Sequence, residues 1–310
     1  MKKNYKDIFV ICFMLWLLMM ILFQKRLIFN TISYSLNLWV KNLLPTMFPF
    51  FIISDILISY NVINYVPSFI KKFFCYIFNV SDQCIAVFFL SSISGFPNNA
   101  RITKIMYEYG AINRDESNII LIFTQFSNPI FILSTVGVLF LHNEKFGYLI
   151  LLSHVMGNVI IGILTRNMFH NRHIDYTEKL KKSQSFSLIF IQAIKRAIDT
   201  LLLILGTLTC FLICASLLIH LFNFSYYTGT IFKGVLEITM GLKSLSSLTI
   251  PAIYKVVISS AFLSFGGLAV HMQVLSQIAD TDISYFPFFV SRIIHAIVSG
   301  FICFIFCLLF

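Results

Sequence analysis

The sequence predicts an all-α polytopic membrane protein: an inverted repeat with two re-entrant hairpins, two broken helices and about seven full spans. The first observation is composition, since 58% of the 310 residues are hydrophobic and only 12% are charged. A soluble domain of this length needs a more charged surface. The second is the length of several apolar stretches, which reach the roughly 20 residues that cross a bilayer core about 30 Å thick. The third is a set of sequence blocks that occur twice in the same order.

The N-terminal apolar stretch, residues 8–23, is expected to form a transmembrane helix within a segment of residues 1–30. It follows a basic N-terminus, as in a signal peptide, but Gln-Lys-Arg at residues 24–26 stands where a cleavage site would have small residues. The helix is therefore expected to be retained. Lysines at positions 2, 3 and 6 predict a cytoplasmic N-terminus by the positive-inside rule.

Two repeats are expected to follow, residues 31–166 and residues 186–310. The block LIFTQFSNPIFIL in the first matches SAFLSFGGLAVHM in the second, and SHVMGNVIIG matches SRIIHAIVSG. Upstream of these blocks, Gly95 pairs with Gly241. Between the repeats, residues 167–185 form a basic linker, which the positive-inside rule again places in the cytoplasm.

One apolar stretch in each repeat, 84–95 and 229–242, is too short to cross the membrane alone and is followed by a bend. We expect both to form re-entrant hairpins, which are tolerated at membrane depth only inside protein or beside a wet cavity. Each half then has an odd number of spans, so the repeats point in opposite directions. The expected full spans are residues 8–23, 43–60, 118–141, 147–165, 186–222, 251–278 and 286–310.

The first hairpin is expected to turn at the sequence SGFPNNAR. Gly95 permits unusual backbone angles, and Pro97 removes a backbone donor. Asn98 and Asn99 suit the start of a second helix, where their side chains would cap exposed N–H groups ahead of Arg101. A helix N-terminus at membrane depth attracts a carboxylate or phosphate. The alternative is an ordinary surface turn between two helices.

The sequence QFSNP lies inside a long apolar stretch. Its proline is expected to interrupt the helix and free backbone carbonyls, with Gln125, Ser127 and Asn128 beside them. In the second half SFGG occupies the matching place, where Gly266 and Gly267 allow the helix to unwind. Broken helices with polar side chains bind ions or small solutes in mid-membrane. The alternative is a proline kink whose freed groups are satisfied by neighbours.

Four further polar residues lie near the second hairpin and the second break. Glu237 and Thr239 precede Gly241, and an ionisable residue at membrane depth suggests function, although Glu237 could instead lie at the interface. His271 and Gln273 follow the second break; a histidine leaves proton coupling open, and the alternative is a satisfied core residue. The substrate-binding candidates are Asn98, Asn99, Arg101, Gln125, Ser127, Asn128, Glu237, Thr239, Gly266, Gly267, His271 and Gln273.

The sequence predicts neither an enzyme nor a cofactor or metal site. GxSxG, HExxH, P-loop and GxGxxG motifs are absent in usable form, and no CxxC pair with a matching histidine occurs among the seven cysteines. The net charge of +10 comes from basic residues in the breaks between apolar stretches, so nucleic acid is not an expected partner. The expected partners are the lipid bilayer and a small solute. A coupling ion (H⁺ or Na⁺) and a homo-oligomer stay open.

The blocks KNLLPTMFPFFI, SGFPNNAR, FSNPIFILSTVG, EITMGL and SFGGLAVHMQVL follow one another along nearly the whole chain. In these blocks the chain resembles the nucleoside-recognition (gate) domain membrane proteins, and among them the sporulation integral membrane proteins of the YlbJ type. The resemblance implies a transporter-like fold of two inverted gate-like repeats. For the sporulation group it implies passage of dipicolinic acid across the outer forespore membrane. The chain departs from that group at Asn98-Asn99, where Gly-Ala is usual, and at Asn128, where Gly is usual.

The leading hypothesis is therefore a multi-pass cell-membrane transporter or facilitator of a small polar, anionic solute, either dipicolinate during sporulation or a nucleoside-like solute. The hairpin tips would act as gates. The alternative is a non-transporting membrane scaffold or morphogenetic protein that recruits partners through the basic linker.

Overall fold

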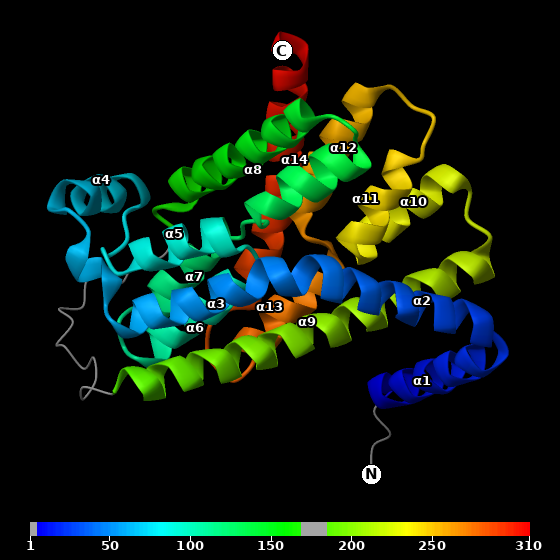
Figure 1. Cartoon of the computed structure of the whole chain (residues 1–310), viewed down its shortest axis with the longest axis horizontal. Coiled ribbons are helices and arrows are strands. Elements are labelled where there is room, and N and C mark those ends of the chain that lie inside the picture. The colour runs from blue at the N-terminus through cyan, green and yellow to red at the C-terminus, as the bar shows by residue number, and fades with distance from the viewer. Residues whose placement is uncertain (1–4, 169–184) are drawn as a thin grey trace.

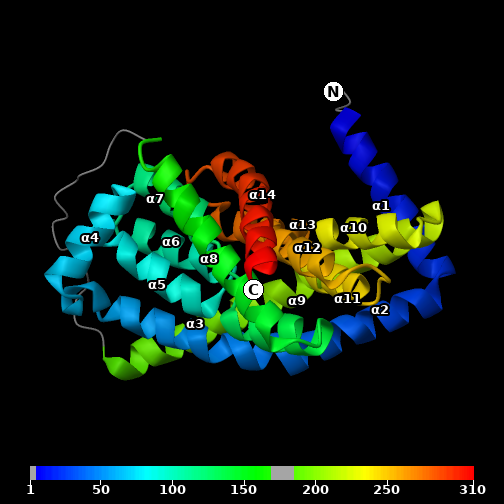
Figure 2. The ribbon, with the colours of Figure 1, turned by 90° about the horizontal axis from the view of Figure 1, so that it is seen from above.

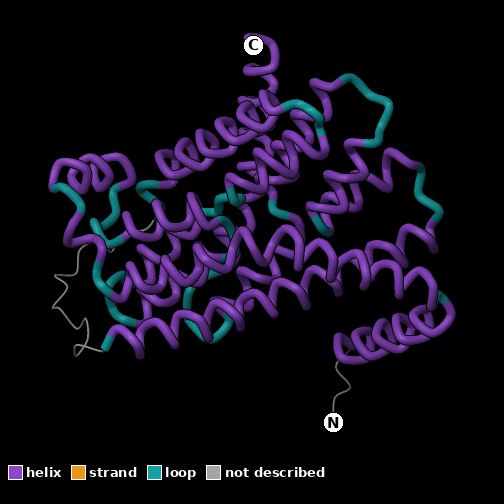
Figure 3. Tube along the Cα trace, viewed as in Figure 1, coloured by secondary structure: helices purple, strands orange, loops and turns teal. Residues whose placement is uncertain are grey.

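A computed structural model describes residues 5–168 and 185–310. Within these residues the chain is helical between its loops, with no strand (Figure 3). The predicted basic linker at 167–185 lies almost wholly outside the described residues.

The elements of the first half are α1 (Tyr5–Phe23), α2 (Lys25–Leu38), the π-helix η1 (Trp39–Leu43), α3 (Leu44–Ser59), the 3-10 helix η2 (Val62–Tyr65), α4 (Ser68–Phe78), α5 (Cys84–Ser94), α6 (Asn98–Glu108), α7 (Arg114–Phe123), the π-helix η3 (Phe131–Phe140) and α8 (Glu144–Thr165).

The second half repeats this order with fewer elements: one long helix, a helical hairpin, an interrupted helix and a final helix. These elements are α9 (Phe186–Phe222), α10 (Tyr226–Leu236), α11 (Ile238–Ser246), α12 (Ala252–Phe265), α13 (Gly267–Ile278) and α14 (Tyr285–Leu309). In the first half the corresponding parts are α2 to α3, the α5–α6 hairpin, α7 with η3, and α8.

Five helical segments of the described chain are long and apolar enough to cross a membrane: Lys25–Ser59, Glu144–Thr165, Phe186–Phe222, Ala252–Ile278 and Tyr285–Leu309. This confirms the predicted all-α membrane class. The predicted span at 8–23 lies within the 19-residue helix α1, and the span predicted at 118–141 is interrupted, with η3 as a shorter apolar helix. The total of seven spans stays a prediction.

The span predicted at 43–60 begins much earlier, at Lys25. Polar side chains of α2 and η1 are accommodated because they bond to α9. Ser35 Oγ of α2 lies 2.9 Å from Thr209 Oγ1, and Trp39 of η1 donates Nε1–H to the Leu201 carbonyl at 2.9 Å. Deeper along the pair, Arg196 of α9 meets Asp55 of α3. Residue numbers rise on one partner as they fall on the other, so the two long helices are antiparallel. They lie side by side along the length of the molecule (Figures 1 and 2).

The two hairpins lie against this long pair, together with the interrupted helices (Figure 1). The first hairpin turns at Gly95–Pro97, as the sequence predicts. The second turns at Glu237, so the pairing of Gly95 with Gly241 as equivalent bends is wrong. Gly241 lies inside α11 because it packs directly on Gly234 of α10.

Both interrupted helices break near the predicted places. The first has no regular secondary structure over residues 124–128, and helix resumes at Pro129. Pro129 therefore begins the second segment instead of interrupting the first, as suits a residue without an N–H group. In the second half α12 ends at Gly266, whose φ of 94° places it in the left-handed region. A single glycine thus separates α12 from α13.

Candidate functional site

A cavity lies where both hairpin tips and both helix breaks meet. The first hairpin contributes Phe96, the first break Ser127 and Asn128, and the second hairpin tip Glu237 and Thr239. The remaining lining residues come from η1 and α3, η3, α9, α11 and α13: Leu43, Met47, Phe131, Ile204, Leu208, Ile238, Ala269, Val270 and Gln273. The long helix pair therefore forms one wall, and parts of both halves form the others.

The cavity volume is about 40 Å³. A buried water needs roughly 10–15 Å³ by this measure, so the space suits a few waters or one small ion. Sites for small molecules usually have about 300–1,000 Å³. In this conformation the site is closed around its polar groups, and a larger solute enters only when the tips or the broken helices separate.

Asn128 joins the first helix break to the first hairpin. Its Oδ1 accepts the N–H groups of Ile130 at 2.9 Å and Phe131 at 3.3 Å, so it caps the helix that begins at Pro129. Its Nδ2 donates to the Ser94 carbonyl at the end of α5, at 3.3 Å. The side chain therefore holds the break against the hairpin tip, a structural role beside any contact with solute.

Glu237 forms the tip of the second hairpin and is buried. Its Oε1 accepts the Thr239 N–H at 3.0 Å and its Oε2 accepts the Met240 N–H at 2.8 Å. The carboxylate thus caps α11, whose N-terminal partial positive charge offsets it. Each oxygen keeps a free lone pair, so Glu237 can still accept from a solute hydroxyl.

Several buried polar atoms beside the breaks lack a hydrogen-bond partner in the described chain. They include both side-chain atoms of Asn99 and Gln125, and the Ser127 hydroxyl. The Gln125 amide lies next to the second break, since a Cβ built on Gly266 would stand 3.5 Å from its Nε2. Buried polar groups without a partner are uncommon, and these mark where water or a solute would complete the hydrogen bonding.

Three of the predicted residues that lie outside the cavity have other defined partners. Asn98 does not cap α6, contrary to expectation, because its amide bonds to Ser94 Oγ at 2.7 Å and accepts from Arg101. Arg101 pairs with buried Asp55 at 2.6 Å. His271 lies at the second break, where Nε2 donates to the carbonyl of Phe265, the last residue of α12, at 3.0 Å.

Of the other candidates, Asn99 and Gln125 do not line the cavity and carry the unpartnered polar atoms described above, and the rest line the cavity or form the second break. Gln273 lines the cavity and donates to Thr207 of α9 at 3.0 Å. Gly266 and Gly267 form the break itself, both with positive φ. The candidate residues that line the cavity therefore come together in space, as predicted. Their role in binding a solute stays a prediction.

Two surface clefts flank the cavity, each about one helical turn away. One, of about 420 Å³, contains Arg101 and Arg196, together with Gln277, one turn beyond Gln273 on α13. The other, of about 460 Å³, contains Lys41 and Lys243, the latter one turn beyond Thr239 on α11. The second cleft has only basic charged residues in its lining, and the first mixes Arg101, Lys104 and Arg196 with Glu108 and Asp199. The cavity thus lies between two polar openings.

A buried histidine connects the two helix breaks, and the sequence analysis did not find it. His154 of α8 accepts the Ser127 N–H at Nε2, at 3.0 Å, and its Nδ1 lies 2.9 Å from Ser264 Oγ. Because Nε2 accepts, the proton of the neutral ring is on Nδ1 and is donated to Ser264. The i, i+4 spacing of His154 and Asn158 in an otherwise apolar helix was the available signal.

We expect His154→Leu to lower the free energy of unfolding by about 2–4 kcal/mol, because it leaves a buried N–H and a buried hydroxyl unpaired at about 1–3 kcal/mol each. Thermal unfolding of the purified protein in detergent measures the change. His220→Leu is the control, since His220 bonds to Gln24 in an exposed position; its effect should stay within about 0.5 kcal/mol. Equal shifts for the two variants would contradict a special role for His154.

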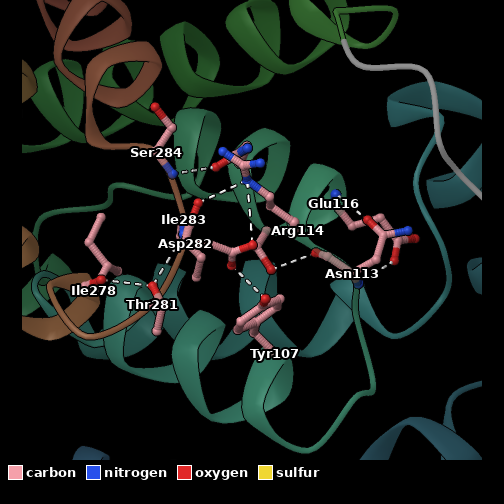
Figure 4. A network of polar contacts seen from close by, with 11 residues as sticks. Tyr107, Asn113, Arg114, Glu116, Ile278, Thr281, Asp282, Ile283 and Ser284 are labelled. Atoms are coloured by element: carbon pink, nitrogen blue, oxygen red, sulfur yellow. Dashed lines mark hydrogen bonds and ion pairs between the residues drawn. The ribbon is translucent and has the colours of Figure 1, made fainter.

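A polar contact outside the cavity ties the first hairpin to the loop between α13 and α14 (Figure 4). Tyr107 of α6 donates its hydroxyl to Asp282 at 2.5 Å, and Arg114 donates to the Asp282 carbonyl at 2.9 Å. Beside them, Lys104 donates to Asp280 at 2.6 Å and thereby lowers the pKa of that carboxyl below its ordinary value. This contact links the two halves at one end of the molecule.

Comparison with known proteins agrees with these features. Residues 40–144, which span the first hairpin and the first break, match the nucleoside recognition (Gate) family. The chain is 26% identical to the sporulation integral membrane protein YlbJ of Bacillus subtilis (strain 168), over 96% of this chain and 82% of that protein. No solved structure matches. The predicted resemblance to gate-domain and sporulation membrane proteins is confirmed.

Proposed function

We propose, from the match to the nucleoside recognition family, that this integral membrane protein is a secondary transporter or facilitator of a small polar, anionic solute. The observation that carries the proposal is a cavity that contains buried polar groups of both halves, such as Asn128 and Glu237, and that lies between two surface clefts. A solute would move from one cleft to the other through a cavity that is closed in the conformation described. Lys41 and Lys243 line one opening without an acidic residue beside them, and they favour an anion there. At the other opening Arg101 and Arg196 are paired with Asp55.

The two halves would form inverted repeats, residues 31–166 and 186–310, with the hairpin tips as gates. The same order of elements in both halves supports this division. The antiparallel packing of the first long helix of each half supports the inversion, because equivalent helices of oppositely oriented repeats run in opposite directions. The N-terminus and the central linker would then be cytoplasmic.

Glu237 helps to choose between the two solute classes. Its charge would repel an anion such as dipicolinate, whereas its free lone pairs would accept hydroxyl groups of a nucleoside-like solute. Glu237→Gln should therefore tighten binding of an anionic solute and weaken binding of a hydroxylated neutral one. The cleft with Lys41 and Lys243 favours the anion, and we propose dipicolinate as the first solute to test because the chain resembles sporulation membrane proteins.

We expect purified protein in liposomes to show saturable uptake of dipicolinate, a dicarboxylate or a nucleoside. Asn128→Leu should reduce that uptake about tenfold or more, since it removes the helix cap and the bond to α5, each about 1 kcal/mol. Asn128→Asp keeps the acceptor for Ile130 and Phe131, so it should stay folded yet transport an anion poorly. Initial uptake rates at several solute concentrations measure both effects.

Asn30→Leu is the matched control, because Asn30 is exposed on α2, and it should transport like wild type. Absence of saturable uptake for all three solutes, or full activity of Asn128→Leu, would overturn the proposal. A scaffold would instead predict a silent Asn128→Leu and loss of function on replacing the basic linker.

A further inference from the structure

Arg292 of α14 is a fully buried arginine whose exposed fraction is 0%. Its Nη2 donates to the carbonyl of Ile122, to which Ser291 Oγ also donates at 3.2 Å. Its Nη1 lies 3.1 Å from Asn158 Oδ1 and 2.9 Å from His295 Nδ1. No carboxylate forms an ion pair with Arg292 in the described part of the chain.

One acceptor of Arg292, the Ile122 carbonyl, belongs to the first helix break, and a second, Asn158 of α8, bonds to that break. Ile122 is in the last turn of α7, and its carbonyl has no helical partner because the Phe126 N–H bonds to Thr124 instead. Asn158 extends the arrangement, since its Nδ2 donates to the Gln125 carbonyl inside the break, at 2.9 Å. The guanidinium and its amide neighbour therefore cover the carbonyls that the interruption of the helix sets free.

A buried positive charge needs a compensating negative one. The C-terminus of α7 provides it, because a helix end has a partial negative charge of about half an elementary charge and unpaired carbonyl oxygens. In transporters with broken helices, freed carbonyls and half-helix C-termini are where coupling cations bind. Here a side chain of the protein already occupies that position.

We infer that Arg292 is a tethered cation that fills the cation position of the first break, so that this break needs no Na⁺ or other inorganic cation. The consequence for transport rests on the proposed function: uptake should not require a Na⁺ gradient. The role at the break itself concerns stability and ion binding, and it is measurable without any solute.

The test compares Arg292→Gln with Arg292→Lys in the purified full chain in detergent. Gln removes the charge, whereas Lys keeps it. We expect the Gln variant to have an unfolding temperature several degrees below that of wild type. Guanidinium at a millimolar, non-denaturing concentration, or Na⁺, should raise the unfolding temperature of this variant by a few degrees relative to choline. The Lys variant and wild type should respond to neither ion. Arg166→Ala, at the end of α8 and away from both breaks, should also respond to neither.

Equal behaviour of the Gln and Lys variants, or a Gln variant that no cation stabilises, would overturn the inference. If neither variant folds, the unfolding temperature of the wild-type protein is compared in Na⁺ and in choline. A higher temperature in Na⁺ overturns the inference, and equal temperatures support it. In liposomes, equal uptake with Na⁺ or choline supports it further, and a requirement for Na⁺ overturns it. Absence of uptake in every salt would remove the proposed function while the unfolding results stand.

Discussion

Gly95→Ala is expected to lower the free energy of unfolding by more than about 3 kcal/mol, because the first hairpin tip has no room for a side chain. Gly95 has a φ of 80°, and a Cβ there would stand 2.6 Å from the Asn128 backbone nitrogen and 2.9 Å from its Cα. With its ψ of 178°, this backbone conformation is one that essentially only glycine adopts, and forcing alanine into it costs about 1–3 kcal/mol. Overlap with backbone atoms that cannot rotate away contributes about 1–3 kcal/mol more.

Gly110→Ala is the comparison variant, because Gly110 has a positive φ without the steric contact. Gly110 also has a positive φ, of 69°, but a Cβ there would meet nothing within 4 Å. Replacing Gly110 with alanine should lower the free energy of unfolding only by the backbone strain, about 1 kcal/mol. Thermal unfolding in detergent compares the stability of the two variants. Solute uptake should fall for Gly95→Ala alone, because its Cβ would push the tip of the first hairpin away from the break at Asn128. Similar losses of stability would show that steric contact at the tip is unimportant.

Gly241→Ala should have the largest effect of any single substitution considered, with little folded protein recovered. A Cβ at Gly241 would lie 2.2 Å from the Cα of Gly234 and 2.5 Å from its nitrogen. The two arms of the second hairpin touch through these glycines, so one added methyl group forces α10 and α11 apart. We expect a loss of more than about 4 kcal/mol, measured by the yield of monodisperse protein and its unfolding temperature.

A paired experiment tests the cause. Gly234→Ala would meet the Phe262 ring at 2.3 Å, so Phe262→Leu should partly restore it. The same second change should not rescue Gly241→Ala, where the obstacle is backbone. Gly206→Ala is the control: it lies in α9 with nothing within 4 Å, and alanine should stabilise that helix by up to about 1 kcal/mol. Rescue of both hairpin variants by Phe262→Leu would contradict the backbone contact.

The sequence predicted the helices whose signals are local. Long apolar runs set α8, α9 and α14, and glycine or proline with polar neighbours located the breaks at Ser127 and Gly266. The course of α2 was missed, because hydroxyl groups such as Ser35 look unfavourable in a span until their partners on α9 are known. A local pattern cannot show a partner that lies far away in the chain.

The candidate site was predicted in part for the same reason. Asn128 and Glu237 stood out because polar residues are rare in apolar sequence, and both line the cavity. The second bend was misplaced because a glutamate can form a hairpin tip by capping the next helix, while Gly241 serves helix packing. The basic clefts join residues such as Lys41 and Lys243, whose proximity only folding creates.

The two long antiparallel segments also bear on how the protein sits in lipid. A helix of 37 residues, the length of α9, measures about 55 Å, whereas the hydrocarbon core is about 30 Å thick. Such a helix either crosses at a steep inclination or extends well into the headgroup layer. If α9 projects equally on both sides, about 12 Å of it lies beyond the core at each end. Arg196 and Asp199, about 15 and 20 Å from its first residue, then lie in the outer part of the core, so the cleft that they line brings charged groups below the headgroup layer.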